Sequence, residues 1–266
     1  MNVVVVVAEN AALVLGLVTC VWLLSLALKD ASIVDVFWGL GFTVVAWATW
    51  WRSERGDHAT LLAALVTLWG VRLAGYIGVR NAGKSEDHRY QAFRAKYQPF
   101  WIKSYFIVFL LQGFLLLIVS LPVQLGMQPR PAGLGPADAA GIAVYIVGLL
   151  FEVVGDAQLA LFKRAQRRAP AQAGQVMDRG LWRYTRHPNY FGEFLLWWGI
   201  GIVALSTPGA WWSALIGPAM ISFLLLRVSG VPILEAAMKE RRPGYAAYVA
   251  RTAAFFPRPP GPRPHH

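Results

Sequence analysis

Long apolar segments recur along most of the 266-residue chain, and they restrict its possible folds more than any other feature. A helix needs roughly 20 predominantly apolar residues to cross the hydrocarbon core of a bilayer. Seven segments approach that length, namely residues 3–28, 33–51, 60–79, 105–121, 139–162, 191–206 and 211–226. The sixth is short and rich in glycine and tryptophan. We therefore predict an all-α integral membrane protein with seven transmembrane helices, built as one domain over residues 1–256 and followed by a Pro-rich, disordered tail at 257–266.

The composition supports a membrane protein and argues against the other classes. Hydrophobic residues make up 56% of the chain and charged residues 15%, whereas a soluble domain carries about 25% charged residues. The single cysteine, Cys20, excludes an internal disulfide framework and a zinc quartet of cysteines. We expect no metal site.

The basic residues are distributed unevenly between the two ends of the predicted spans. Most Lys and Arg residues fall in the segments 80–103, 163–186 and 227–263, whereas Arg52, Arg55 and Arg130 flank the other ends. Basic loops remain on the cytoplasmic side of a membrane. We therefore expect the N-terminus outside and the basic loops and C-terminus in the cytoplasm. This distribution accounts for most of the net charge of +11, and we expect no nucleic-acid partner.

The segment 180–193, GLWRYTRHPNYFGE, is a basic and aromatic loop that runs into an apolar segment. Pro188 suits the first turn of a helix, and Asn189 and Glu193 would then share one helix face. With Arg179, Arg183 and Arg186 nearby, these groups suit a ligand that carries both phosphates and an amide. The alternative is an ordinary positive loop with an aromatic belt, which leaves Asn189 and Glu193 unexplained.

Other ionisable residues fall inside predicted spans, where they are usually functional. They are Asp35, Arg72, Glu152 and Asp156, and Tyr76 lies one turn after Arg72. Asp35 could simply complement a helix dipole. The remainder could form a structural network of buried ion pairs, with Arg72, Arg186 and Arg227 as partners for the two carboxylates. Alternatively, Asp156 could accept hydrogen bonds from the ribose or amide of a ligand.

Two charged segments outside the spans allow two interpretations each. The segment SEDHRYQAFRAKY could be a salt-bridged cytoplasmic lid or a solvated loop. The tail RRPGYAAYVARTAAFFP could fold over the site or lie along the membrane.

The motifs GxGxxG, GxxxxGK[ST] and HExxH are all absent from the sequence. Helix-borne side chains would therefore have to hold any nucleotide cofactor.

The residues RYTRHPNYFGE, the following WWG, the EDHRY segment and the tail together resemble the bacterial DUF1295 group of the steroid 5-alpha-reductase family. The resemblance covers most of the chain. It implies a seven-helix reductase of the bacterial inner membrane, similar to 3-oxo-5-alpha-steroid 4-dehydrogenases, with NADPH in a cytosol-facing cavity. Its substrate would be an apolar small molecule with a carbon–carbon double bond conjugated to a ketone, entering from the bilayer lipid. We expect a monomer.

The resemblance also assigns roles to residues of this chain. Contacts to NADPH are implied for Asp156, Arg179, Arg186, Asn189, Tyr190 and Glu193. Arg227, Tyr245 and Tyr248 would close the site from the C-terminal side. We add Arg72, Arg183, Tyr184 and His187 to the cofactor-binding residues, and we expect catalytic roles for Asp35 and Tyr76 in stabilising the enolate.

The residues expected to contact the substrate differ from the pattern of the family. The steroid enzymes carry a Gln-Glu pair on the second helix, where this chain has Asp35, and a tyrosine on the third helix, where it has Trp69. The substrate could therefore be a bacterial enone, a polyprenoid or a lipid-derived olefin as well as a steroid.

Two other functions also remain open. One is an S-adenosylmethionine-dependent methyltransferase of the isoprenylcysteine carboxyl methyltransferase type, and the other is a non-catalytic lipid-binding or transport protein.

Overall fold

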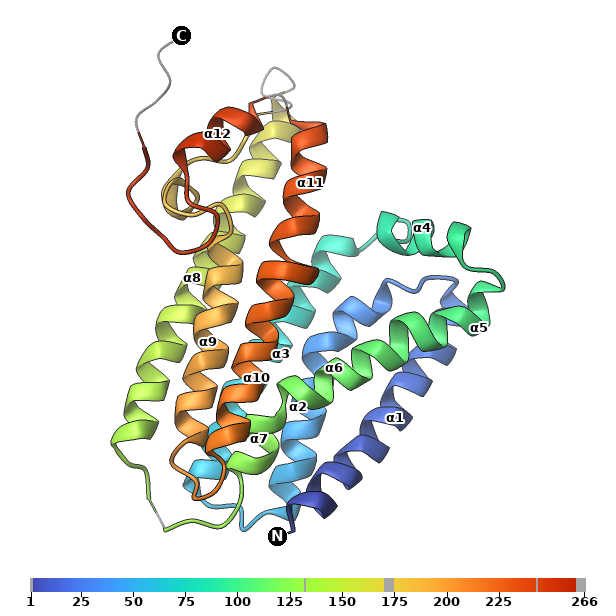
Figure 1. The fold of residues 1–266 in the computed structure, drawn as a ribbon. Helices are drawn as coiled ribbons and strands as arrows, with labels where there is room; N and C mark the ends of the chain where they lie inside the picture. The colour runs from blue at the N-terminus through green and yellow to red at the C-terminus, as the bar shows by residue number, and fades with distance from the viewer. Residues whose placement is uncertain (1, 132, 170–174, 243, 262–266) are drawn as a thin grey trace. The chain divides into compact units, whose positions relative to one another are not determined.

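The computed structural model describes residues 2–131, 133–169, 175–242 and 244–261, and these residues form helices and no strand (Figure 1). The helices are α1 (Val3–Leu28), α2 (Ile33–Arg52), α3 (Asp57–Asn81), α4 (His88–Lys96), α5 (Phe100–Ser104), α6 (Leu111–Val119), α7 (Leu121–Gly126), α8 (Pro136–Arg168), α9 (Pro188–Ala204), α10 (Trp211–Phe223), α11 (Val231–Arg241) and α12 (Tyr245–Arg251). A π-helical turn, Tyr105–Leu110, joins α5 to α6, and a second, Leu224–Val228, follows α10. The all-α fold predicted from the sequence is confirmed.

Six helical stretches of the described chain are long and apolar enough to cross a membrane, which indicates a multi-pass membrane protein. They are Val3–Leu28, Ile33–Arg52, Asp57–Asn81, Phe100–Val119, Pro136–Arg168 and Trp211–Glu240. The remaining predicted span corresponds to α9, whose 17 residues fall short of the roughly 20 that a simple crossing needs. The count of seven spans stays a prediction, and so does the cofactor cavity.

The chain divides into two compact units. The first comprises Met1–Ala139 and Ile200–Gly217, and the second comprises Ala140–Gly199 and Pro218–His266. The single domain expected from the sequence stays a prediction.

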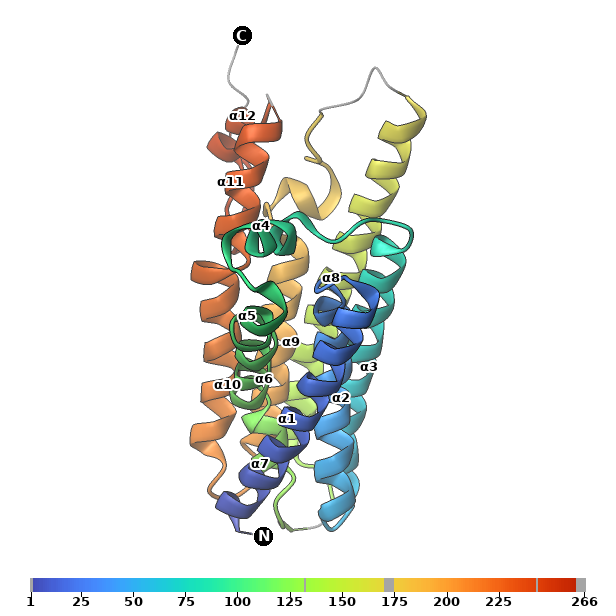
Figure 2. The ribbon, with the colours of Figure 1, turned by 90° about the vertical axis from the view of Figure 1, so that its right-hand side faces the viewer.

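In the first unit, α2 and α3 make the most extensive helix contact, and α1 packs against α2 and α6 (Figures 1 and 2). Gly39 and Gly70 permit the close approach of α2 to α3, since a Cβ on Gly39 would lie 2.4 Å from the carbonyl oxygen of Gly70. Small residues at helix contacts are a common packing device in membranes. Close to this crossing, Phe42 and Trp69 make an edge-to-face contact with ring centroids 5.4 Å apart.

A buried polar network also joins helices of the first unit. The Asn10 amide donates to Thr49 Oγ1 at 2.9 Å and to Gln124 Oε1 at 3.1 Å, so it connects α1 with α2 and α7. All three side chains are fully buried. Satisfied hydrogen bonds of this kind hold helices together where surrounding lipid offers no competing partners.

In the second unit, α8 and α9 approach through glycines spaced seven residues apart. A Cβ on Gly192 would lie 2.5 Å from the carbonyl oxygen of Gly148, and one on Gly199 would lie 2.7 Å from that of Gly141. A seven-residue spacing returns each glycine to the same helix face. The two backbones therefore lie in direct contact, and this contact brings Asp156 of α8 near the beginning of α9.

Large hydrophobic side chains are exposed along the described helices. Val79 is 82% exposed, Phe106 58% and Leu23 54%. Exposed apolar surface on this scale marks an interaction with lipid or another apolar partner. The helices therefore suit a lipid environment.

Candidate functional site

The loop before α9 is shaped by hydrogen bonds to α8. It contains a 3₁₀ turn, Gly180–Arg183, that begins with Gly180 at φ +58°. A glycine adopts this left-handed conformation without steric cost. The Leu181 amide donates to Gln158 Oε1 at 3.0 Å, and the Trp182 indole donates to the Gly155 carbonyl at 3.0 Å. The buried Trp182 thereby fixes the loop against α8.

The C-terminal segment folds over this loop (Figure 1). The Tyr248 hydroxyl of α12 donates to the Trp182 carbonyl at 2.5 Å. Thr185 and Ala253 form an isolated parallel β-bridge, and the Arg186 amide donates to the Ala253 carbonyl at 2.9 Å. The structure therefore shows the tail folded onto the loop that carries the predicted site, and the site itself stays a prediction.

The contact continues into the first part of the predicted disordered tail. The amide of Arg258 donates to the Tyr184 carbonyl at 3.1 Å, and the amide of Gly261 donates to the Arg251 carbonyl at 2.8 Å. Residues 262–266 of that tail lie outside the described residues.

The guanidinium of Arg186 is buried and bound to the protein itself. Its Nε and Nη2 atoms lie 2.8 and 2.6 Å from Glu235 Oε1 on α11. Its Nη1 donates to the Thr252 carbonyl at 2.5 Å. One side chain therefore joins the loop, α11 and the end of α12.

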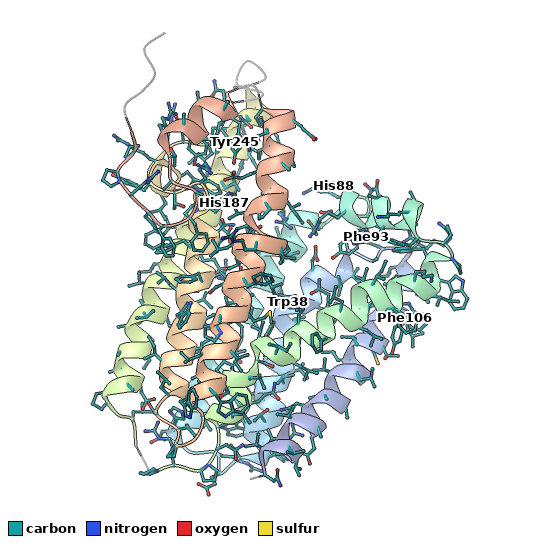
Figure 3. All side chains as sticks on the ribbon, viewed as in Figure 1. Trp38, His88, Phe93, Phe106, His187 and Tyr245 are labelled. Carbon is teal, nitrogen blue, oxygen red and sulfur yellow. The ribbon has the colours of Figure 1, made fainter. Side chains whose placement is uncertain are left out.

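Glu235 also faces the histidine of the HPNY sequence. His187 Nε2 lies 3.3 Å from Glu235 Oε1, and the imidazole stacks on Tyr190 with centroids 5.6 Å apart and planes at 10°. Figure 3 places His187 at the start of α9 and Tyr245 at the start of α12. Burial raises the pKa of Tyr245 to about 12, and the charge of Glu235 adds to the effect. Tyr245 is therefore a neutral phenol at physiological pH.

Helix α9 begins at Pro188, as predicted, and Asn189 and Glu193 lie one turn apart on it. The Asn189 amide Nδ2 donates to Asp156 Oδ1 at 3.3 Å. Asp156 and Glu152, one turn apart on α8, are both buried. The structure thus brings together two predicted site residues, the Asn189 carboxamide and the Asp156 carboxylate, at one end of the α8–α9 contact.

The other predicted residues of the loop and the tail differ in exposure. Arg179 and Arg183 are exposed, and no described residue forms an ion pair with either. Tyr184 is 44% exposed. Arg227 is exposed in the second π-helical turn. Three arginine side chains of the second unit are therefore accessible to an anion.

In the first unit, Asp35 is the centre of a salt-bridged cluster with α4. Its Oδ2 accepts from Arg89 Nη2 at 2.5 Å, and its Oδ1 accepts from the Tyr90 hydroxyl at 2.7 Å. Burial raises the pKa of Tyr90, as does the nearby charge of Asp35. The segment is salt-bridged, whereas its role as a cytoplasmic lid stays a prediction. Both oxygens of the predicted catalytic carboxylate accept hydrogen bonds from the protein.

A second ion pair holds the segment before α4. Glu86 accepts from the amide of Ala31 at 2.8 Å and from Arg94 Nη2 at 2.8 Å. Burial opposes ionisation of Glu86, but the hydrogen bonds from Arg94 and Ala31 outweigh burial and lower its pKa. In Asp87 the hydrogen bonds from Arg89 likewise outweigh burial and lower the pKa.

Arg72 and Tyr76, also in the first unit, lie one turn apart on α3 and are half-buried. The Arg80 guanidinium lies 5.9 Å from the Tyr76 ring centroid. Their roles in cofactor binding and catalysis stay predictions.

Sequence reasoning missed Glu235, which pairs with both Arg186 and His187. It stands alone among apolar residues in VPILEAAM, directly after the last predicted span. An acidic residue in such apolar surroundings requires a cationic partner. The isolation of Glu235 in the sequence therefore indicates an ion pair with an arginine or a histidine.

Comparison with known proteins gives a family but no activity. Residues 21–252 match the family described as a protein of unknown function, DUF1295. An uncharacterized protein of the fission yeast Schizosaccharomyces pombe is 26% identical over 255 residues, covering 85% of this chain and 68% of its relative. No solved structure matches significantly. Because the match extends over most of the helices and the whole of the loop, the chain belongs to the DUF1295 family.

Proposed function

We propose that the protein is an NADPH-dependent membrane reductase that acts on a carbon–carbon double bond conjugated to a ketone in an apolar, lipid-derived or steroid-like substrate. The observation that carries the proposal is the hydrogen bond between Asn189 and Asp156, with Glu193 one turn further along α9. Asp156 orients the Asn189 carboxamide, whose Oδ1 is left as an acceptor. Such a group, with a carboxylate on the same face, suits recognition of a nicotinamide carboxamide.

The chemistry of the exposed arginines also fits this cofactor. Arg179 precedes the 3₁₀ turn of the loop and Arg183 is its last residue. Guanidinium groups bind phosphates in bidentate geometry. Arg186 is not available to bind a phosphate, because its guanidinium already donates to Glu235 and to the Thr252 carbonyl. We assign phosphate binding to Arg179 and Arg183, and to Arg186 the positioning of the loop that carries them.

Each group then has a separate task. NADPH, when bound, supplies the hydride. Asn189 and Glu193 orient the carboxamide, and Trp182, Tyr245 and Tyr248 form a buried wall that keeps the loop in place. Asp35 and Tyr76 belong to the first unit, and their catalytic roles stay predictions from the sequence.

A cofactor titration of the detergent-purified protein tests the proposal. Thermal unfolding would be followed with NADPH, NADH and S-adenosylmethionine in turn, because a ligand that binds the folded state raises the midpoint. We expect stabilisation by NADPH, its loss in Asn189→Ala, and its weakening in the double variant Arg179→Ala, Arg183→Ala. Arg164→Ala on α8 is the matched control, an exposed arginine of the same unit.

The stacking of His187 on Tyr190 favours one other function, a methyltransferase of the isoprenylcysteine carboxyl type. Its RHPxYxG loop would place His187 and Tyr190, which stack in this structure, beside S-adenosylmethionine. Stabilisation by S-adenosylmethionine with no response to either nicotinamide dinucleotide would replace the reductase proposal with this one.

A further inference from the structure

A hollow of about 280 Å³ lies in the first unit, between the C-terminal end of α1 and the beginning of α5. Leu26 and Lys29 line it from α1 and its cap, and Phe100 and Trp101 line it from α5. Arg94 of α4 completes the polar side. The hollow belongs to the first unit, whereas the residues assigned to the cofactor belong to the second unit, except for Arg72.

Two cationic side chains of this hollow retain unused donors. Arg94 gives its Nε and Nη2 to the two oxygens of Glu86, at 3.0 and 2.8 Å, and so keeps both N–H groups of Nη1. Lys29 caps α1 at φ +54° and is exposed, and within the described chain no acidic group pairs with its ammonium. The hollow therefore has a cationic end with donors for an anion.

The remaining wall is apolar and continues onto the outer surface of the helices. Leu26 and the buried Phe100 lie within the hollow, whereas Trp101 is 56% exposed. The Trp22 indole donates to the Trp101 carbonyl at 2.9 Å, which fixes the end of α1 to α5. Beyond Trp101, Ile102 is 38% exposed. An apolar chain leaving the hollow would thus continue along exposed apolar side chains.

We propose that this hollow binds the headgroup of an anionic phospholipid. Lys29 and Arg94 Nη1 would hold the phosphate, and an acyl chain would lie along Trp101 and Ile102. The size agrees with a headgroup, because about 280 Å³ lies just below the roughly 300–1,000 Å³ of pockets that enclose whole small molecules. The location agrees as well, since basic pockets between membrane helices at the interface bind lipid headgroups.

Native mass spectrometry of the full chain in detergent tests the proposal, with phosphatidylglycerol, phosphatidylcholine and soluble glycerol phosphate as separate probes. We expect retention of phosphatidylglycerol above phosphatidylcholine, and no retention of glycerol phosphate. Lys29→Gln should weaken phosphatidylglycerol binding about fivefold. Lys103→Gln, an exposed lysine of α5 that does not line the hollow, should leave it unchanged.

A second variant keeps both cations and removes the space. Leu26→Trp should fill the hollow and reduce phosphatidylglycerol binding, while the lipid-free protein keeps its thermal midpoint. Equal binding of the two phospholipids, or equal effects of the two lysine substitutions, would overturn the proposal. Retention of glycerol phosphate as strong as that of the lipid would overturn it in favour of a free-phosphate site.

Discussion

Glu235 illustrates how much of the loop depends on single residues. One of its oxygens faces both the Arg186 guanidinium and the His187 imidazole. Taking an arginine out of water requires such a partner, because an uncompensated buried charge is strongly destabilising. The loop geometry therefore depends on a carboxylate about 50 residues further along the chain.

We predict that Glu235→Ala destabilises the second unit by about 3–5 kcal/mol, since it leaves the Arg186 guanidinium buried without its partner. Thermal unfolding in detergent measures the loss. The double variant Arg186→Met, Glu235→Leu should lose less than Glu235→Ala alone. Glu240→Ala, an exposed carboxylate on the same helix, is the control, and an equal loss there would contradict the assignment.

At the scale of elements, the α8–α9 contact is determined by glycines. Gly148 and Gly192 lie so close that a Cβ on either would approach the facing backbone to about 2.5 Å. Contact of this kind is possible only where both helices present small residues at the same level. It determines the distance between Asp156 and Asn189, and hence the shape of the proposed amide site.

Gly192→Ala should therefore destabilise the protein by about 1–3 kcal/mol, the usual cost of overpacking. A lowered thermal midpoint, with a parallel loss of cofactor response, would be the readout. Gly16→Ala serves as the control, because nothing lies within 4 Å of its added Cβ. That variant should be neutral or stabilising by up to roughly 1 kcal/mol.

The helix α4 should respond to acid. The pKa values of Glu86 and Asp87 are lowered in the folded protein, so their stabilising ion pairs are present above the unfolded values and disappear as pH falls through the folded ones. The protection of the α4 amides against hydrogen exchange, taken relative to the intrinsic rate at each pH, should therefore fall below about pH 4. Glu86→Gln should show faster exchange already at pH 7. Protection of α4 that stays the same relative to the intrinsic rate between pH 7 and pH 3 would contradict this interpretation.

The elements were predictable where a local pattern specifies them, and less so elsewhere. The apolar run 3–28 predicted α1 with its observed bounds, and Pro188 marked the start of α9. The bridge between Thr185 and Ala253, and the pairing of Arg186 with Glu235, join segments far apart in sequence. The hydrophobic periodicity of a sequence predicts helices and strands, but it does not predict contacts between distant segments. The sequence therefore predicted the loop as a site but assigned Arg186 to a phosphate without anticipating its protein partner.

For the whole molecule, the distribution of basic residues is the main guide to orientation. The exposed apolar helices indicate a multi-pass protein, and the basic loops predict which ends face the cytoplasm. In a Cys20→Ser background, a membrane-impermeant maleimide added to intact cells should label Leu134→Cys and leave Gln91→Cys unlabelled. Both positions are exposed, and the reverse pattern would invert the predicted topology.

The hydrogen bonds between the loop and the C-terminal segment also affect when the loop can fold during translation. Residues 182–186 are held by Tyr248, Thr252, Ala253 and Phe255. While the ribosome is still translating α11, those partners do not yet exist. The nascent loop can therefore make these contacts only after residues 248–255 have been translated.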